Sequence, residues 1–224
     1  MGSKVPSLST ALLADLLADT CPSAASAPDA LITALADLEP RASITTVDAS
    51  TTEALSAYYS AYVLALLLAN DITEARYLCH RIDNSLLAAD AATLAATHVL
   101  QALWSKDYLA FHETMQTAPW GDVATVLASR LLQSHRTQTI HLLTTAYTSL
   151  PPSLAQRYLG ISDEPRAVKM LVEEHPHLGW SFDADSGLLV RATDAPAASG
   201  KTRRLAKQGE LGRLAVLGGF LSDS

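Results

Sequence analysis

The sequence has few cysteines, the residues that crosslink a chain or bind structural metal through thiolates. Only two cysteines, Cys21 and Cys79, occur in 224 residues. They are far apart, with neither the spacing of a metal site nor the density of a disulfide framework, which favours a reducing compartment. Basic residues are also scarce. The formal net charge of −7 argues against a general nucleic-acid binder, because such proteins need a basic face.

Long hydrophobic runs are missing as well. The longest apolar run, residues 61–69, falls well short of the roughly 20 residues that a membrane-spanning helix requires. The N-terminus shows no secretory pattern. We therefore expect a soluble intracellular protein that makes no contact with a membrane.

One local sequence pattern occurs twice within residues 54–120. An apolar helix ends at Asn70-Asp71, and the same arrangement returns at Lys106-Asp107, 36 residues later. Each aspartate is placed to accept hydrogen bonds from the free N–H groups of the helix that follows it. The period is close to the roughly 34 residues of tetratricopeptide-type repeats, which predicts stacked helix pairs. Such surfaces usually hold partners rather than substrates.

Hydrophobic periodicity predicts a mainly α fold. Residues 62–68 are apolar almost all round, so the helix that contains them should be central. Pro40 should end the second helix and be followed by a loop over residues 41–52. The predicted helices of the first two thirds of the chain cover residues 7–20, 29–39, 53–69, 71–87, 91–105, 107–117, 123–133 and 139–147.

The pattern changes after residue 121. A short helix starts at Pro151-Pro152 and ends at Gly160, and another runs from there to about Glu174. Two β-like runs, residues 180–182 and 188–190, flank a turn that predicts a hairpin. This order indicates a winged helix. We expect N-terminal helices and a loop (1–52), helical repeats (53–120), a winged helix (121–192), and a linker with a C-terminal helix (193–224).

The histidines raise the question of a metal site. His175 and His177 form an H-x-H pair, as in isopeptidases with an Mpn-type zinc site, but Asp185 and Leu188 occupy the positions where that site needs serine and aspartate. His112-Glu113 begins like H-E-x-x-H, yet Gln116 stands where the second histidine belongs. Likewise, Gly200-Lys201-Thr202 ends like a phosphate-binding loop that lacks its first glycine. We expect no catalytic residue, metal, cofactor or small-molecule substrate.

A winged helix can also read nucleic acid with the helix that follows its turn. That helix carries more acidic than basic residues, which disfavours contact with a polyanion. The basic run from Lys201 to Lys207 is either a solvated tail or a nuclear-localisation or anion-contacting patch. A winged-helix nucleic-acid module and a hydrolase using the two histidines of the H-x-H pair stay open as alternatives.

Two further groups of apolar residues need an explanation. The aromatic residues near the repeat turns should fill gaps between stacked helices, with a ligand groove as the alternative: Tyr77, Trp104, Tyr108, Phe111 and Trp120. The last predicted helix, residues 205–221, either folds back on its own chain or docks with a partner. Its apolar face comprises Leu211, Leu214, Leu217, Phe220 and Leu221.

Helical repeats followed by a winged helix resemble the layout of PCI domains. Six stretches narrow the match: Asn70-Asp71, Ala75-Arg76-Tyr77-Leu78, Lys106-Asp107-Tyr108, Ala146-Tyr147-Thr148-Ser149, Leu159-Gly160-Ile161 and Gly179-Trp180. In combination they resemble the family of subunit 8 of the COP9 signalosome, over about residues 54–221. Related families are a small subunit of the proteasome lid and subunit k of translation initiation factor three.

The resemblance implies a non-catalytic scaffold in a complex that removes the ubiquitin-like protein Nedd8 from cullins, through a zinc site in another subunit. It implies that the winged helix joins neighbouring PCI subunits, where we expect Trp180, Leu188 and Val190 to make contact. The last helix would enter a shared helical bundle through its five apolar residues. We expect the chain in the cytoplasm and nucleus, with other signalosome subunits as its partners.

Overall fold

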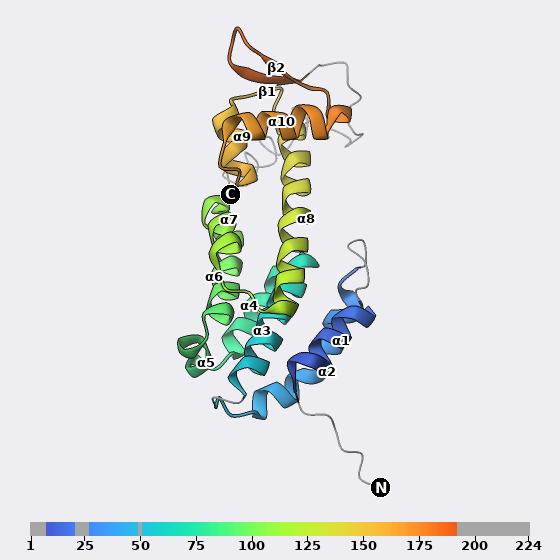
Figure 1. The fold of residues 1–224 in the computed structure, drawn as a ribbon, viewed down its shortest axis with the longest axis vertical. Helices are drawn as coiled ribbons and strands as arrows, with labels where there is room; N and C mark the ends of the chain where they lie inside the picture. The colour runs from blue at the N-terminus through green and yellow to red at the C-terminus, as the bar shows by residue number, and fades with distance from the viewer. Residues whose placement is uncertain (1–7, 21–26, 49–50, 192–224) are drawn as a thin grey trace, which may run out of the picture. The chain divides into compact units, whose positions relative to one another are not determined.

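The computed structural model describes residues 8–20, 27–48 and 51–191, in which ten α-helices and one small sheet follow one another (Figure 1). The chain divides into two units, Met1–Ala192 and Thr193–Ser224. The second unit, with the predicted last helix and its apolar residues, lies outside the described residues. Division of the first unit at residues 52 and 120 stays a prediction. Among the described residues, no helix is both long and apolar enough to cross a membrane.

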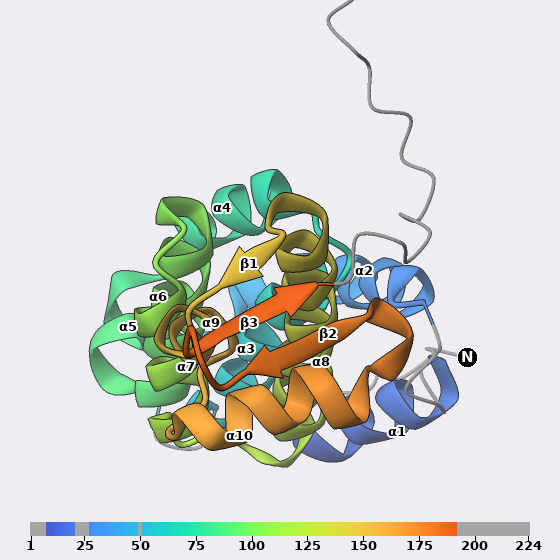
Figure 2. The same cartoon turned by 90° about the horizontal axis from the view of Figure 1, so that it is seen from above.

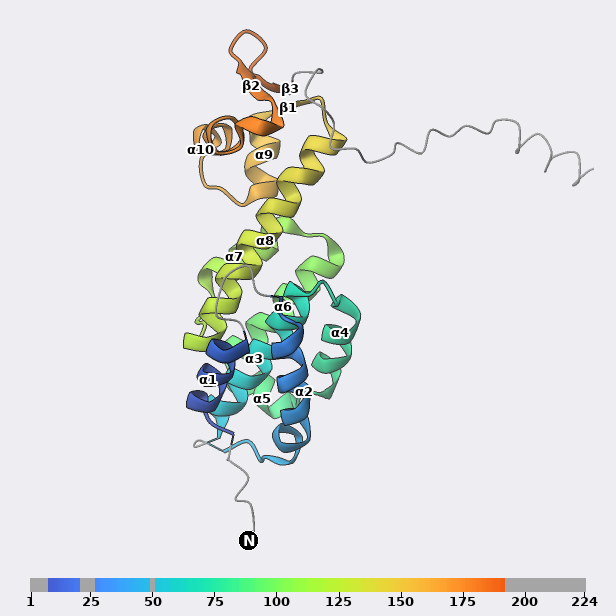
Figure 3. The ribbon, with the colours of Figure 1, turned by 90° about the vertical axis from the view of Figure 1, so that its right-hand side faces the viewer.

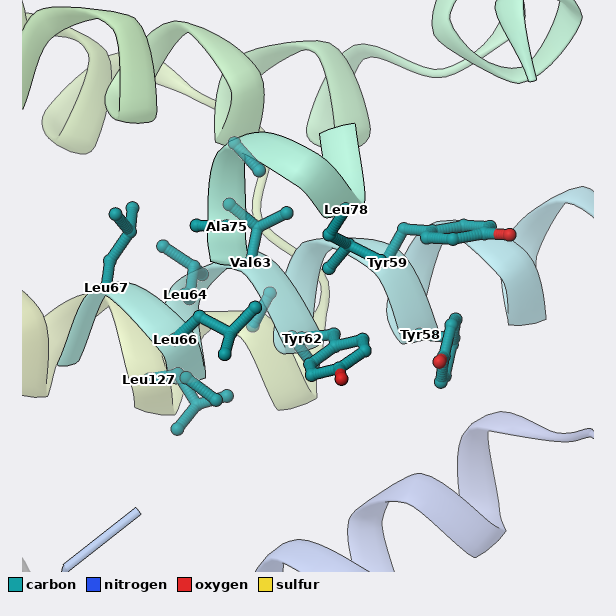
Figure 4. Packing of buried hydrophobic residues seen from close by; sticks show 14 of the residues in the cluster. Tyr58, Tyr59, Tyr62, Val63, Leu64, Leu66, Leu67, Ala75, Leu78 and Leu127 are labelled. Atoms are coloured by element: carbon teal, nitrogen blue, oxygen red, sulfur yellow. The ribbon is translucent and has the colours of Figure 1, made fainter. Parts of the chain in front are cut away.

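Helix α3, Thr52–Leu68, occupies the centre of the larger hydrophobic core. From Leu55 to Leu67 nearly every side chain is buried, which confirms the prediction of a central helix (Figure 4). The buried Tyr58 hydroxyl donates to the carbonyl of Leu35, at 2.9 Å. Its ring therefore fills the core while its polar end is satisfied. Burial raises the pKa of this phenol far above its usual range, so it stays protonated.

Helices α1, Thr10–Thr20, and α2, Asp29–Ile44, pack beside α3 (Figure 3). The prediction that Pro40 ends α2 was wrong, because the helix continues for one more turn. A proline inside a helix removes one backbone hydrogen bond. Here the extra turn buries Ala42 in the core, and the Thr45 hydroxyl donates to the Arg41 carbonyl.

The helix predicted over residues 71–87 is two helices, α4, Ile72–Arg81, and α5, Asn84–Ala89. Ile82 and Asp83 adopt extended backbone between them. The Asp83 carboxylate accepts a hydrogen bond from the Ser85 N–H, at 2.8 Å, and so caps the second helix. The sequence signal was this aspartate, which acts as an N-cap rather than as an interior residue.

The doubled pattern is confirmed as one turn used twice. Asn70 follows the end of α3, and Lys106 follows the end of α6, Ala91–Ser105; both residues have positive φ, 62° and 58°. In each turn the following aspartate N–H donates back to the helix at 2.9 Å, from Asp71 to Leu66 and from Asp107 to Ala102. The Asp71 and Asp107 carboxylates then cap α4 and α7, Tyr108–Thr117. Two copies of one turn therefore stack the helix pairs.

Helix α8, Asp122–Ala146, is continuous, whereas two helices were predicted. No glycine or proline interrupts residues 133–139, so nothing in the sequence breaks it. Its first half, through Leu131, packs in the core around α3. Its second half contributes Ile140 and Leu143 to a smaller core. One helix thus belongs to both cores.

The smaller core lies in a winged helix that follows α8 (Figure 2). Its three-stranded antiparallel sheet has the order β1-β3-β2, and the two-residue strand β1 was missed in the sequence. The predicted hairpin, the proline-started helix and the helix ending near Glu174 are confirmed. The elements are β1 (Ser149–Leu150), α9 (Pro152–Leu159), α10 (Glu164–Lys169), the π-helical η1 (Met170–Glu174), the 3-10 helix η2 (Pro176–Leu178), β2 (Trp180–Asp183) and β3 (Leu188–Arg191).

The two copies of the repeat turn differ in their left-handed residue, asparagine in one and lysine in the other. Asparagine tolerates this backbone conformation better than lysine. We expect Lys106→Asn to stabilise the chain by about 0.5 kcal/mol and the reciprocal Asn70→Lys to destabilise it by a similar amount. Urea unfolding of the two variants beside the wild type measures both changes. A loss of stability in Lys106→Asn would contradict this account of the turn.

Candidate partner interface

The winged helix presents one face of its sheet away from the smaller core. In the register, Val190 lies between Ser149 on β1 and Ser181 on β2, and Leu188 lies opposite Asp183. Because strand side chains alternate between faces, these residues share the outer face. Leu188 and Val190 are partly exposed there, flanked by short polar residues. The outer face is therefore the part of the sheet that can contact a partner, and the contact role of Leu188 and Val190 stays a prediction.

Trp180 lies on the opposite face and is only 4% exposed. Its indole N–H donates to the Thr144 hydroxyl on α8, at 3.1 Å, and Arg191 donates to the Thr144 carbonyl. Trp180 thus joins the sheet to α8 and does not fit the predicted role of a direct partner contact. In the sequence, Trp180 and Phe182 lie two residues apart on one strand and so share a face of the sheet. The sequence did not show whether that face meets the core or the solvent.

Phe182 was missed in the sequence and is 46% exposed near the end of β2. It lies on the same face as Trp180, but Leu189 opposite it is fully buried. β2 is also an edge strand, so one of its backbone rows has no partner strand among the described residues. An exposed aromatic residue on an edge strand is a common feature of contact surfaces.

The position of the winged helix is set by contacts of α9 with α7 and α8. Arg136 on α8 donates to the Leu159 carbonyl, at 3.1 Å, at the end of α9. Gly160 ends α9 with φ of +60°, and its α-carbon faces the His112 ring of α7 so closely that an added β-carbon would lie 2.0 Å from the ring. Only glycine fits here. This packing joins the last repeat helix directly to the winged helix.

Two histidines are buried at this junction. His112 is almost fully buried, and its Nε2 lies 3.2 Å from the Tyr158 carbonyl. A carbonyl only accepts, so Nε2 carries the hydrogen and Nδ1 is left without a partner. The ring of His135 packs against Phe111, with centroids 4.4 Å apart. Burial lowers the pKa of both histidines, that of His135 to about 4, so both are neutral at pH 7.

A hollow of about 480 Å³ opens between α7 and α9 beside His112. Ser153 and Ser162 line it, but the Nε2 of His112 is bound to the Tyr158 carbonyl rather than to a hydroxyl. Histidine and serine therefore do not form a nucleophile–base pair in this hollow.

Cys79 lies outside this hollow. Burial raises the pKa of its thiol to about 11, which keeps the thiol protonated and unreactive.

The histidines of the H-x-H pair lie together, with ring centroids 5.7 Å apart. In the described part of the chain, no group of three or more histidine, cysteine, aspartate or glutamate side chains is placed to hold a metal ion. The helix that would enter a nucleic-acid groove is α10, and it continues into η1 with Glu173 and Glu174 exposed. Glu173 pairs with Lys169, at 3.7 Å, which leaves little free positive charge on this helix.

The predicted aromatic filling of the repeats is only partly correct. Phe111 is fully buried, and Tyr108 and Trp120 are partly buried. Tyr77 and Trp104 are 58% and 59% exposed, so for them the prediction was wrong. Each occupies the solvent side of an otherwise amphipathic helix, where periodicity would have excluded it from the core.

The close packing of Gly160 generates a test with a matched control. Gly187 has a similar φ, +68°, but nothing lies within 4 Å of the position of its β-carbon. We expect Gly187→Ala to cost about 1 kcal/mol, the strain of left-handed backbone. Gly160→Ala should cost at least about 2 kcal/mol more, because the His112 ring must also move. Urea unfolding measures the difference. Equal losses would show that the contact with His112 is unimportant.

The buried histidines make stability depend on pH. In the unfolded chain a histidine has a pKa near 6.5, whereas folding lowers that of His135 to about 4. As pH falls from about 6.5 to 4, the unfolded state takes up a proton that the folded state does not, so stability falls. We expect a loss of about 2 to 3 kcal/mol across this window from His135.

Urea unfolding at pH 7 and pH 5 measures the larger part of this loss, and His135→Leu should make the stability depend less on pH. If the pH dependence of that variant equals that of the wild type, groups other than His135 cause it. Hydrogen bonds from Ser85 and Ser186 lower the pKa of Asp83 and Asp183, so both carboxylates stay ionised between pH 7 and pH 5.

Comparison with known proteins gives one consistent family. The sequence pattern of the CSN8/PSMD8/EIF3K family matches residues 53–200, well over half of the chain. A COP9 signalosome complex subunit 8 from Emericella nidulans is 26% identical over 192 residues, covering 85% of this chain and 88% of the relative. The protein of the same name from Danio rerio is 28% identical over 142 residues, 63% of this chain and 72% of that protein. With its helical repeats and winged helix, the chain belongs to the CSN8/PSMD8/EIF3K family.

Proposed function

We propose that this chain is a non-catalytic assembly subunit of a COP9 signalosome, the complex that removes Nedd8 from cullins. The observation that carries the proposal is the family match together with relatives that bear the name of signalosome subunit 8. The alternative is an equivalent scaffold role in the proteasome lid or in translation initiation factor three, whose subunits give the family the rest of its name. The names of the relatives favour the signalosome over both.

One described surface and one stretch of sequence support assembly. The outer face of the winged-helix sheet offers Leu188 and Val190, which a neighbouring subunit would cover. The last segment, residues 193–224, carries the apolar series from Leu211 to Leu221 that would enter a helical bundle with other subunits. Exposed apolar residues on a fixed scaffold are what a subunit interface requires. The complex would work in the cytoplasm and nucleus.

Substitutions on each surface test the proposal in the chain's own cells. Affinity purification of the tagged full-length chain, with mass spectrometry, should recover signalosome subunits. Val190→Asp should reduce that recovery at least roughly tenfold, because a carboxylate is costly to bury in an apolar contact. Leu214→Asp with Leu217→Asp, or ending the chain at Ala198, should do the same. Val126→Asp is the control, since Val126 is exposed on α8 far along the chain from the sheet.

The outcomes separate the parts of the proposal. Recovery of proteasome-lid or initiation-factor subunits by the wild type would move the scaffold role to a sister complex. Recovery of none of these would overturn it. Full recovery with Val190→Asp would show that the outer face of the sheet is not a contact. Circular dichroism melting of each variant must match the wild type, so that a lost partner is not mistaken for a lost fold.

A further inference from the structure

Arg76 on α4 and Trp104 on α6 form an exposed pair, and the exposed Tyr77 follows Arg76 in the chain. We call Arg76 and Trp104, together with Tyr77, the aromatic face. Tyr77 and Trp104 are more than half exposed, although both are among the residue types that proteins usually cover. Tryptophan, tyrosine and arginine are also the residues in which protein interfaces concentrate their binding energy. The composition of this face is that of a binding site.

The arginine of this face is held in place and has free hydrogen-bond donors. The Arg76 guanidinium carbon lies 5.1 Å from the centroid of the Trp104 ring, so the cation stacks on the indole and links α4 to α6. In the described residues Arg76 forms no ion pair or hydrogen bond. Its planar fork of N–H groups is therefore oriented by the ring and open to a carboxylate.

The acidic residues closest along these helices are already engaged. Asp71 and Asp107 cap the helices that follow them, at 3.0 and 3.2 Å. Glu74 pairs with Arg81, at 3.0 Å. Lys106, exposed at the end of α6, adds a second cation that forms no ion pair in the described part of the chain. Asp71 and Asp107 keep their negative charge as caps, so the cations open to a partner here are Arg76 and Lys106.

We propose that the aromatic face binds an acidic peptide segment of a partner protein. A carboxylate of the segment would accept hydrogen bonds from the unpaired N–H groups of Arg76. An apolar side chain next to that carboxylate would cover Trp104 and Tyr77. Two cations are too few for a nucleic acid, whose tight binders neutralise several phosphates. This site is independent of the assembly role, since that role uses the sheet of the smaller core and residues 193–224.

A selection with displayed peptides tests the proposal on the full-length chain. A library of random short peptides is selected in parallel on the wild type and on a variant with Arg76→Glu and Trp104→Ala. Peptides enriched on the wild type alone should contain several aspartate or glutamate residues and at least one leucine, phenylalanine or tryptophan. Labelled copies should bind the wild type at least roughly tenfold more tightly than Arg76→Glu, by fluorescence anisotropy. The affinity should also fall as salt is raised.

Arg166→Glu and Leu142→Ala make the same kinds of change at exposed positions elsewhere and should leave the affinity unchanged. A basic or purely apolar consensus, or equal binding to Arg76→Glu, would overturn the proposal. So would a salt-sensitive interaction of this face with single-stranded RNA that is tighter than with any selected peptide. A wild-type dimer that Arg76→Glu converts to a monomer in sedimentation would identify a second copy as the occupant and overturn it as well.

Discussion

The absence of a solvent-facing side on most of α3 is the constraint on which the rest of the structure depends. A helix that is apolar all round is stable in water only when other helices cover every side of it. Here α1 and α2, α4, α6 and α8 supply that cover. Polar atoms on α3 are placed accordingly. Ser56 donates to Asp90, at 2.7 Å, and Asp90 also caps α6, so one carboxylate both starts a helix and holds it against the centre.

Helix α8 connects the helices around α3 to the winged helix. Its first half is part of the cover of α3, and its second half is part of the smaller core, so the two cores share one rigid element. Thr144 near its end accepts hydrogen bonds from Trp180 and Arg191, while Arg136 holds the end of α9. The winged helix is therefore fastened at its sheet and at its first helix. A contact surface fixed on both sides loses less entropy when a partner binds it.

Much of the fold could be predicted because its elements follow from local rules. The central helix, the repeated turn and the hairpin each come from periodicity or from a residue with a special backbone preference. The predictions failed where packing decided the outcome. Pro40 is tolerated inside α2 because the turn after it buries Ala42. Local sequence rules do not predict which residues tertiary packing will bury. The sequence contains no helix breaker between the two halves of α8, so one continuous helix could have been predicted. Two helices were predicted because each half packs in a different core and therefore has its own hydrophobic periodicity.

The candidate site was harder to predict, because exposure depends on which face of an element meets the core. Alternation along β2 placed Trp180 on one face or the other, and only the pairing with β3 decides that it is buried. Trp104 was assigned to the core by its type, although its position on α6 lies on the solvent side.

Both errors concern large aromatic residues. Their hydrophobicity predicts burial in the core, whereas their frequent use in interfaces predicts exposure on the surface. Two buried polar side chains join elements of the chain itself, since Tyr58 joins α3 to α2 and His112 joins α7 to α9. Leu188, Val190 and Trp104 are instead open to a partner, on elements that this packing holds in place. That distribution suits a protein whose work is to hold other proteins.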